Sequence, residues 1–474
     1  MVETQTKNQS MFWLWSDEID FQKRGDAIYW SPELVALGKH KNSISLKQVA
    51  EIKGGKRLPL GEDFSNDGDV PYIRTTDFTS GYIDYSELKK ISEKVFNAIR
   101  NYQIYKDEVL ISIVGTIGAI AILDKRFERC NFTENAAKIV CSNKLNPYYL
   151  YAFLLSQIGQ RQLKRLTVGG VQPKLPLYAV EEIKILLPNS QTQQKVEQTI
   201  KEVFQLKTEA EKEYQQAVDV FLKNIKTHIS EWDDLTNETQ KAFWFWSDQV
   251  DITNRIDPDY YSGEGIRNKL GKVKPLADLA EIKIGKTPAF DDYLPSGNRR
   301  IMKFRAITGR GIDWENEERG FVKEEFFQKN KQNKLEKNDI VLGSAAHQAH
   351  YIGKYLDIVD ELPQEFADGV LTVAEIMTIR AKDAINPFVL LQFLRSDVGY
   401  ELIQRQIKGQ TSHLYPKDVE SIGIPEDVIK ISKSKAGSEI EGKTKSSLEK
   451  ARLSKQKLQE AKDFVGNLVK RNSE

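Results

Sequence analysis

The chain has 474 residues, and its 69 Lys and Arg nearly balance 68 Asp and Glu, which leaves a formal net charge of +1 at pH 7. This length corresponds to about three domains, and an apolar content of 40% argues against an intrinsically disordered chain. The near-zero charge excludes a histone-like polybasic binder, although basic residues can still cluster locally. Two cysteines, Cys130 and Cys141, exclude a disulfide scaffold and a cysteine-rich zinc domain, and they suit a reducing cytosol.

No segment is typical of export or membrane insertion. Residues 1–5 are polar and lead into no apolar region of the kind found in signal peptides. The longest apolar stretch, residues 109–123, is short for a transmembrane helix, is interrupted by glycine and is rich in β-branched residues. It predicts two buried strands joined by a turn, in a soluble cytoplasmic protein without a membrane partner.

An internal repeat organises the chain. Residues 12–17 read FWLWSD and recur at 243–248 as FWFWSD. Further matches follow in the same order, and they are residues 46–56 with 276–286, 106–110 with 337–341, Asn146-Pro147 with Asn386-Pro387, and Gly169 and Pro176 with Gly409 and Pro416. Their number and order predict a duplication, with net insertions in the second copy.

Each copy predicts an α+β globule with a mixed or antiparallel sheet plus helices. Short β-branched runs, such as residues 70–74 and 139–140, are typical of strands. One amphipathic helix is expected after each Asn-Pro pair, from Pro147 to about Lys164 and from Pro387 to about Gln406, because Asn is a good N-cap and Pro suits the first helical position.

A seven-residue apolar repeat follows each globule. In the first copy it consists of Val196, Ile200, Val203, Ala210, Tyr214, Ala217 and Phe221, with Lys207 interrupting it and Leu206 able to compensate. In the second copy it consists of Leu448, Ala451, Leu458, Val465 and Leu468, with Lys455 off the pattern. These repeats predict two long helices that form an antiparallel coiled coil. Residues 432–447, rich in Ser and Lys, fit either a flexible lead-in or a poorly formed helical turn.

Four segments result from these patterns. They are a first globule at 12–188, a helix at 189–230, a second globule at 243–425 and a helix at 426–474. The predicted architecture is therefore two similar globules separated by two long helices, with a pseudo-two-fold internal repeat.

The usual motifs of nucleotide chemistry are incomplete. Gly285-Lys286-Thr287 resembles the end of a phosphate-binding P-loop, but Ala280 stands where the first glycine is required. Asn146-Pro147-Tyr148 lacks the second proline of amino-methyltransferases, and no Gly-x-Gly-x-x-Gly loop follows a strand. A self-contained cofactor site is not expected.

Two further clusters have a simpler structural interpretation. Asp259 with Glu281-Ile282-Lys283 resembles a nuclease carboxylate set, but the first copy repeats only the triplet, as Glu51-Ile52-Lys53, which favours a strand edge. His347 and His350 have no carboxylate or thiolate at a spacing that completes a metal site.

The ordered motifs, twice over, resemble the specificity subunit (HsdS) of type I restriction–modification systems. The matching segments of the first copy are residues 24–33, 46–56, 73–78, 107–118, 167–175 and 188–196. The second copy departs from the family pattern at 343–348, 409–414 and 425–428. Because these departures cluster where loops are expected, the two globules are predicted to read different DNA sequences.

The resemblance implies a non-catalytic subunit that reads a split, asymmetric target in double-stranded DNA. Each globule would place loops in the major groove of one half-site, where every base pair is distinguishable. The helical segment 196–221 would act as a ruler of ~39 Å, or about 11 base pairs. Implied partners are two methyltransferase subunits, which carry S-adenosylmethionine, and restriction subunits; the chain itself would need no cofactor or metal.

Basic and polar residues near the predicted loops are the candidates for DNA contact. In the first copy they are Lys53, Lys56, Arg57, Arg74, Gln172 and Lys174, and in the second Lys283, Lys286, Thr287, Arg305, Gln348 and His413. Any one of them is equally well explained as a solvated surface group. The alternatives for the whole chain are a protein-binding scaffold and, less favoured, a diverged nuclease or methyltransferase.

Overall fold

The computed structural model divides the chain into two compact units. Unit 1 contains residues up to 205 together with those from 453 onward, and unit 2 contains residues 206–452. The structure describes residues 32–65, 67–78, 81–85, 88–169, 172–225, 270–315, 320–366, 368–408 and 412–471. The repeated FWxWSD segments, most of the 24–33 motif and Asp259 lie outside the described residues.

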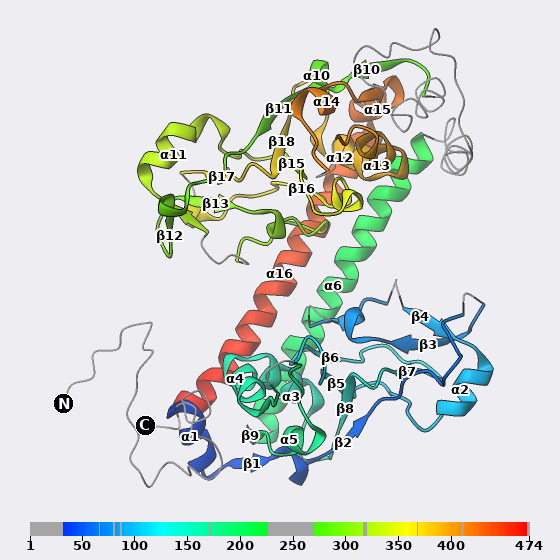
Figure 1. Cartoon of the computed structure of the whole chain (residues 1–474), viewed down its shortest axis with the longest axis vertical. Helices are drawn as coiled ribbons and strands as arrows, with labels where there is room; N and C mark the ends of the chain where they lie inside the picture. Colours follow the sequence, from blue (N-terminus) through cyan, green and yellow to red (C-terminus); the bar gives the residue numbers. More distant parts are fainter. Residues whose placement is uncertain are drawn as a thin grey trace, which may run out of the picture. The chain divides into compact units, whose positions relative to one another are not determined.

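Unit 1 contains a small mixed sheet, a four-stranded antiparallel sheet and a two-stranded ribbon (Figure 1). The antiparallel sheet has the order β2 (Ala50–Gly54), β8 (Ala136–Cys141), β5 (Val109–Ser112) and β6 (Ile120–Ile122). The mixed sheet has the order β4 (Lys89–Ile91), β3 (Val70–Ile73) and β7 (Asn131–Phe132), with β3 and β7 parallel, and β1 (Ser43–Ser45) pairs with β9 (Lys184–Leu186). The predicted strand, turn and strand in residues 109–123 are confirmed as β5 and β6.

Unit 2 repeats this topology. Its antiparallel sheet has the order β11 (Ala280–Ile284), β18 (Ile376–Ala381), β15 (Ile340–Gly343) and β16 (Leu356–Ile358). Its mixed sheet has the order β12 (Tyr293–Leu294), β14 (Phe321–Val322), β13 (Arg300–Met302) and β17 (Val370–Thr372), and β10 (Val273–Pro275) pairs with β19 (Gly423–Pro425). As in unit 1, the mixed sheet has one parallel pair, β13 with β17. The predicted duplication is thus confirmed at the level of strand order.

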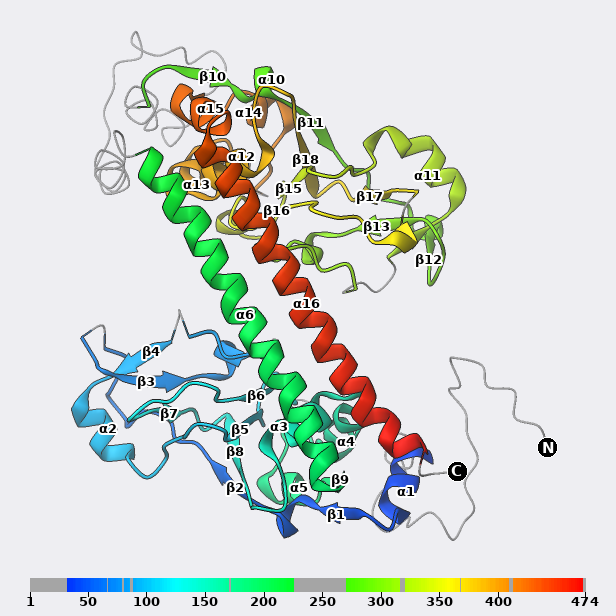
Figure 2. The same ribbon diagram turned by 180° about the vertical axis from the view of Figure 1, so that it is seen from behind.

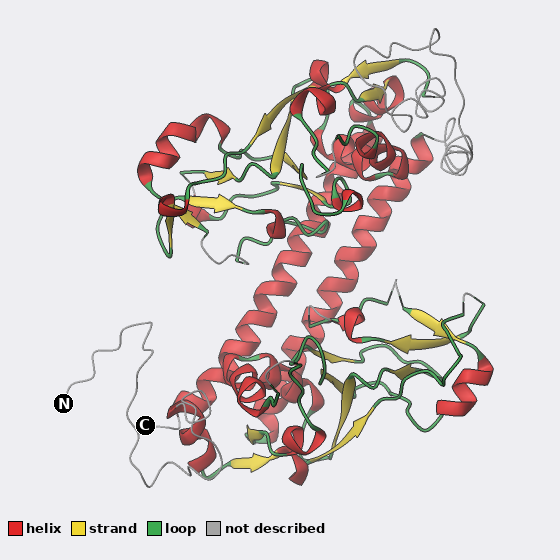
Figure 3. Cartoon of the chain, in the orientation of Figure 1, coloured by secondary structure: helices red, strands yellow, loops and turns green. Residues whose placement is uncertain are grey.

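Short helices accompany the sheets of both units (Figure 3). Unit 1 has α1 (Pro32–Lys39), α2 (Glu93–Ile99), α3 (Pro147–Leu155), α4 (Gln157–Leu166) and α5 (Leu177–Glu181), with 3-10 turns η2 (Leu46–Gln48) and η3 (Thr75–Phe78). Unit 2 has α10 (Leu276–Leu279), α11 (Glu324–Asn330), α12 (Pro387–Arg395), α13 (Asp397–Gln404), α14 (Pro416–Glu420) and α15 (Glu426–Ser432). Its 3-10 turns are η4 (Phe290–Asp292), η5 (Phe304–Ala306), η6 (Lys331–Asn333), η7 (Ala349–Tyr351) and η8 (Gln364–Phe366).

The prediction of one continuous helix after each Asn-Pro pair is wrong, because a serine divides it. Ser156 is extended, with φ −66° and ψ 160°, and its Oγ accepts a hydrogen bond from the Gly159 N–H at 3.3 Å, so α3 ends and α4 begins there. Ser396 does the same between α12 and α13. The predicted N-cap is confirmed, since Asn146 Oδ1 accepts the Tyr148 N–H at 2.9 Å.

Two long helices, α6 (Ser190–Asn224) and α16 (Lys435–Arg471), contribute to the cores of both units (Figure 2). The α6 repeat is confirmed, because its apolar positions are buried or half-buried, whereas Lys207 is exposed and Leu206 half-buried. Residues 432–447 are helical almost throughout, because α16 already begins at Lys435. Gly437 permits this tight start, since a Cβ there would lie 2.5 Å from Ile431 O.

The contacts of α16 correct its predicted apolar repeat, because buried serines form part of the seam. In unit 1, Ser454 Oγ donates to Val203 O at 2.9 Å, and in unit 2, Ser447 Oγ donates to Ala210 O at 2.7 Å. The acceptors lie seven residues apart on α6 and the donors seven apart in the opposite direction, which is an antiparallel heptad register. Buried serines therefore form part of this seam together with the predicted Leu448 and Val465, which are buried.

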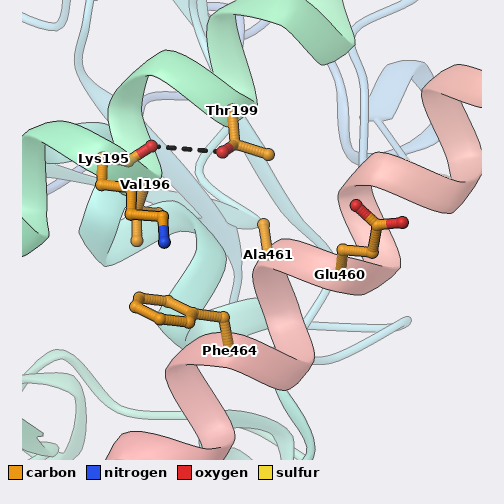
Figure 4. A pocket seen from close by; sticks show the side chains of 6 residues that line it. All are labelled: Lys195, Val196, Thr199, Glu460, Ala461 and Phe464. Atoms are coloured by element: carbon orange, nitrogen blue, oxygen red, sulfur yellow. Dashed lines mark hydrogen bonds between the residues drawn. The ribbon is translucent and has the colours of Figure 1, made fainter.

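In unit 1 the same helices leave a small hollow of about 230 Å³ (Figure 4). Lys195, Val196, Ala461 and Phe464 are among the residues that line it, and Lys195 Nζ lies 5.0 Å from the centre of the Phe464 ring.

Candidate nucleic-acid interface

Two loops of unit 1 meet beside the end of β5. The loop after α4 closes on itself, because Val168 and Lys174 exchange two backbone hydrogen bonds of 2.8 Å, and the Leu175 N–H donates to Ile113 O at 2.9 Å. Gly115 in the facing turn has φ +78°, which is a left-handed conformation that favours glycine. The structure thus brings the exposed Gln172 and Lys174 beside the turn of residues 115–118.

Unit 2 builds the same loop pair with other side chains. Lys408 and His413 exchange backbone hydrogen bonds of 2.8 and 3.0 Å, and the Leu414 N–H donates to Ser344 O at 2.9 Å. His413 therefore occupies the place that Lys174 has in unit 1. Because this loop is one residue shorter, Tyr415 precedes α14 as Pro176 precedes α5, which corrects the predicted pairing of Pro176 with Pro416.

The facing loop of unit 2, residues 344–355, is longer than its unit 1 counterpart and carries aromatic and basic side chains. Gln348 is exposed there, and the ring centres of His350 and Tyr351 lie 4.1 Å apart. Lys354 Nζ lies 5.9 Å from the centre of the Tyr351 ring. Tyr351 and Lys354 were missed from the sequence, although the net insertion between β15 and β16 was a signal. Adjacent aromatic rings beside a cation are suited to bases and phosphates.

A second basic region lies at the end of β2 in unit 1. Gly55 is structural, because a Cβ there would lie 2.1 Å from Thr133 O, and the Lys56 N–H donates to Phe132 O at 3.0 Å. The Lys56 side chain is exposed, with Nζ 5.7 Å from the centre of the Tyr102 ring. Arg57 pairs with a glutamate in the same region.

These cations are held only loosely by acidic neighbours. Lys53 pairs with Glu51 at 2.9 Å and Arg57 with Glu134 at 3.2 Å, and the basic partners are at least half exposed. Exposed pairs of this kind contribute about 0–1 kcal/mol, so a phosphate can replace the carboxylate. Lys138, on the neighbouring strand, is instead buried, with Nζ 2.9 Å from both carboxylate oxygens of Glu108.

The matching region of unit 2 is a cavity of about 610 Å³. Basic side chains dominate its lining, which includes Lys283, Arg299, Lys331, Lys334 and Arg380 together with the acidic Glu336 and Asp368. Lys283 Nζ lies 3.1 Å from Glu281 and 3.3 Å from the Gln332 carbonyl oxygen. The structure thus places Lys283 inside an ion-pair network rather than on an open face.

The remaining predicted residues divide into exposed and internally engaged ones. Lys286 is exposed beside Thr287, whose Oγ1 accepts the Ala374 N–H at 3.1 Å and so braces the turn. Arg305 is exposed in η5. Arg74, at the matching turn η3, is held by Asp77, with Nη2 2.6 Å from Oδ1. The structure does not bring Arg74 or Arg305 into the loop pairs.

A buried carboxylate anchors one further loop of unit 2. Asp357 is 0% exposed and accepts the N–H groups of Thr308, Gly309 and Gly311 at 2.7–2.9 Å, and Arg395 Nη2 lies 2.9 Å from it. At the tip of this loop, the guanidinium carbon of Arg310 lies 3.8 Å from the centre of the Tyr214 ring on α6. These contacts join the loop of residues 308–311 to α6.

In unit 1 the corresponding loop, around Gly81 and Tyr82, is held by a neutral hydrogen bond and an aromatic contact. Tyr151 donates from its hydroxyl to Gly81 O at 2.5 Å, and the rings of Tyr82 and Phe204 lie 5.8 Å apart. The Tyr82 hydroxyl also lies 3.4 Å from Ser454 Oγ on α16.

The described residues offer little for other chemistry. They contain no group of three or more His, Cys, Asp or Glu that could hold a metal ion. Burial raises the pKa of the Cys130 and Cys141 thiols to about 12, so neither is a ready nucleophile. None of the helices in this part of the chain is long and apolar enough to cross a bilayer.

Comparisons with known proteins agree with the motifs. Residues 39–219 match the sequence model of the family described as type I restriction modification DNA specificity domain. The chain is 26% identical over 159 residues to the type I restriction enzyme EcoBI specificity subunit of Escherichia coli, covering 33% of each protein. It is 23% identical over 165 residues to the MjaVIII specificity subunit of Methanocaldococcus jannaschii, covering 34% of this chain and 38% of that one. The match thus spans about a third of the length of these relatives.

Solved structures include similar chains. The S subunit of a type I restriction-modification system from M. genitalium is 13% identical, with 91% of this chain and 95% of that chain covered and a TM-score of 0.39. The HsdS subunit from Thermoanaerobacter tengcongensis is 14% identical, with 88% and 95% covered and a TM-score of 0.27. The likeness rests on the sequence matches: residues 39–219 are similar to the type I restriction modification DNA specificity domain, and the chain is similar over about a third of its length to two type I specificity subunits.

Proposed function

We propose that the chain is the non-catalytic DNA sequence-specificity subunit of a type I restriction–modification complex. Each unit reads one half-site of an asymmetric, split target in double-stranded DNA. The family match supports the function, and one observation supports the division of labour: the same framework carries different side chains at the same loop pair. Lys174 stands in unit 1 where His413 stands in unit 2, and the short turn of residues 115–118 in unit 1 is replaced by the longer, aromatic-rich loop of residues 344–355 in unit 2.

The loop pairs are suited to base edges and the β2 region to phosphates. Exposed Gln and Lys side chains on a rigid loop can hydrogen-bond to bases in the major groove, where each base pair has its own donor and acceptor pattern. Lys53, Lys56 and Arg57 would contact phosphates, which fix the register of the protein on the duplex. The near-neutral chain then relies on its assembly for much of the affinity.

The long helices set the gap between half-sites. A seven-residue step along a helix advances ~10 Å, which corresponds to about three base pairs at ~3.4 Å each. Removing one heptad from both α6 and α16 should therefore shorten the gap by about three base pairs and leave both half-sites unchanged. A mapped target with an unaltered gap would contradict this role.

The catalytic work belongs to partners. Two methyltransferase subunits, each binding S-adenosylmethionine, would modify the target, and restriction subunits would cleave unmodified DNA. The complex would act in the cytosol, where it reaches the chromosome. The family likeness supports these partners, because a specificity subunit acts as part of a larger enzyme.

The decisive experiment is to express the chain with its methyltransferase and sequence the host DNA for modified bases. We expect one asymmetric motif with a fixed gap. Lys174→Ala should then relax one half-site and His413→Ala the other, because a lost base contact costs about 1–3 kcal/mol of discrimination. A stable complex that modifies no DNA, or that shows no sequence preference, would favour the protein-binding scaffold instead.

A further inference from the structure

Two large apolar side chains stand out by their exposure. Leu60 is 106% exposed and Phe290 is 76% exposed, which are the two highest values among large apolar side chains in the described part of the chain. Each projects from the loop that follows the first strand of its antiparallel sheet, β2 or β11. A single exposed apolar residue is ordinary and needs no explanation.

The two residues occupy the same position of the repeat. Gly55 N–H donates to Ala136 O at 3.1 Å, and Gly285 N–H donates to the equivalent Ile376 O at 3.0 Å. The next residues, Lys56 and Lys286, likewise donate to β7 and β17 at 3.0 and 2.9 Å. Leu60 lies five residues after Gly55, and Phe290 lies five residues after Gly285. The recurrence therefore rests on backbone contacts and not only on the alignment of two sequences.

The recurrence indicates one kind of ligand bound twice. The residues between lysine and tip differ, Arg57-Leu58-Pro59 against Thr287-Pro288-Ala289, so what both loops share is the glycine, the lysine and the apolar tip. Loops that read different half-sites should diverge at their contact residues, as Lys174 and His413 do. A shared apolar tip instead fits a surface that is the same for both units.

The charges beside the tips favour a protein over DNA. Asp63 follows Leu60, next to Glu62, which is held in an ion pair by Lys94, and Asp291 and Asp292 follow Phe290. Carboxylates next to an inserting side chain repel the phosphate backbone, whereas they suit the polar rim that surrounds an apolar anchor at a protein interface.

We propose that Leu60 and Phe290 are the anchors through which the two units each dock one copy of the same protein partner. That partner is the methyltransferase subunit, so the proposal rests on the proposed function and adds the contact residues to it. Each tip would fill an apolar pocket of the partner, with the following carboxylates at the edge of the contact, while Lys56 and Lys286 remain free to face DNA.

The test measures how many methyltransferase subunits the full chain binds, and how tightly. Leu60→Ser and Phe290→Ser, singly and together, are compared with the unsubstituted chain by mass photometry and titration calorimetry. We expect each single variant to weaken one of two binding steps at least tenfold and the double variant to weaken both. Leu60→Phe and Phe290→Leu should restore binding. Tyr178→Ser, which removes a 66% exposed ring in unit 1, should leave both steps unchanged.

The outcomes separate this proposal from the proposed function. If the unsubstituted chain binds two methyltransferase subunits and the serine variants bind them equally well, the anchors are wrong and the function stands. If the serine variants bind methyltransferase normally but the assembled complex loses affinity for DNA, the tips are DNA wedges and the proposal is overturned. If the unsubstituted chain binds no methyltransferase, both proposals fail. Because both side chains are exposed, unfolding curves of the serine variants should match that of the unsubstituted chain.

Discussion

The two units hold an equivalent loop in place differently: unit 2 uses a buried charged residue at one position of its antiparallel sheet, and unit 1 has an apolar residue there. Asp357 lies opposite Val341 in unit 2, and Ala121 lies opposite the equivalent Leu110 in unit 1. The helix residue beside it changes in parallel, from Arg395 to Leu155. Unit 2 therefore uses a buried ion pair to anchor the loop of residues 308–311, where unit 1 uses apolar packing and the Tyr151 hydroxyl.

This difference shows that a duplicated framework can keep its strand registers while the interactions beneath its loops are replaced. The replaced residues come as pairs, because a carboxylate without its arginine, or the reverse, would leave an unpaired charge in the interior. Each unit can then vary its loops independently of the other.

The largest expected effect comes from breaking the pair in unit 2. Asp357→Ala should lower the free energy of unfolding by about 3–5 kcal/mol, because it leaves Arg395 buried and unpaired. It also removes the acceptor of three loop N–H groups. Urea unfolding followed by hydrogen exchange would measure the loss and assign it to unit 2.

The matched control imports the unit 1 solution. Asp357→Ala combined with Arg395→Leu removes the unpaired charge, so we expect it to be more stable than Asp357→Ala alone. It should stay below the original chain, because each buried N–H left without an acceptor costs about 1–3 kcal/mol. Equal stabilities of the single and double variants would show that Arg395 contributes nothing to the anchor.

A second prediction concerns a position where the units agree. Gly55→Ala and Gly285→Ala should each destabilise their own unit by about 1–3 kcal/mol, because overpacking forces the backbone to shift. The added Cβ would lie 2.1 Å from Thr133 O and 2.2 Å from Thr372 O. Thermal unfolding with hydrogen exchange would locate each effect.

Gly442→Ala is the control, since no atom lies within 4 Å of its added Cβ and it occupies the exposed face of α16. It should stabilise the chain by about 1 kcal/mol, which is the difference in helix propensity between Gly and Ala. If all three variants behaved alike, the close approach at Gly55 and Gly285 would be of no consequence.

Local patterns predicted the β5–β6 pair and the Asn caps, because each depends on residues close together in sequence, and the repeat was visible because its segments recur in the same order. Gly55 and Lys56 were recognised within the motif of residues 46–56, and Lys56 was predicted to contact DNA, but the sequence did not show that the glycine is needed for the close approach of β7. One sequence by itself does not show which distant strand a glycine will approach.

The buried ion pairs, the break between α3 and α4, and the serines in the α16 seam depend on contacts that the sequence pattern does not show. Asp357 and Arg395 meet only through tertiary structure, as do Lys138 and Glu108. Ser156 was missed because apolar spacing continues across it. Ser447 and Ser454 were missed because serine counts as polar in an apolar repeat, although its hydroxyl is satisfied by a carbonyl of the facing helix.

A third prediction compares these two serines. Ser454→Ala and Ser447→Ala should each cost about 0.5–1.5 kcal/mol, the contribution of one hydrogen bond. Ser454 should lie at the upper end, because it is 3% exposed and also lies 3.4 Å from the Tyr82 hydroxyl, whereas Ser447 is 6% exposed. Chemical unfolding of the two variants side by side would test the order, and Tyr82→Phe should reduce the difference.

The smallest effect concerns a feature that both units share. Asn146 Nδ2 donates to Glu197 at 2.6 Å, and Asn386 Nδ2 donates to Glu441 at 2.6 Å, so each long helix is tied to an N-cap of its own globule. The hydrogen bond from Lys201, joined by that from Asn146, holds the pKa of Glu197 below its ordinary value of 4.5. The folded state thus binds this proton more weakly than the unfolded chain does.

The sign of the pH dependence follows from that lowered pKa. The stability that Glu197 contributes is present above pH 4.5 and is lost as the pH falls through the pKa of the folded state. Glu197→Gln should cost about 0.5 kcal/mol at neutral pH, as expected for a partly exposed pair, and should flatten the fall in stability below that pH. Urea midpoints measured across this range would show it. Parallel curves for variant and original chain would mean that Asn146 holds the helix equally well through a neutral amide, so that geometry rather than charge joins each globule to its helix.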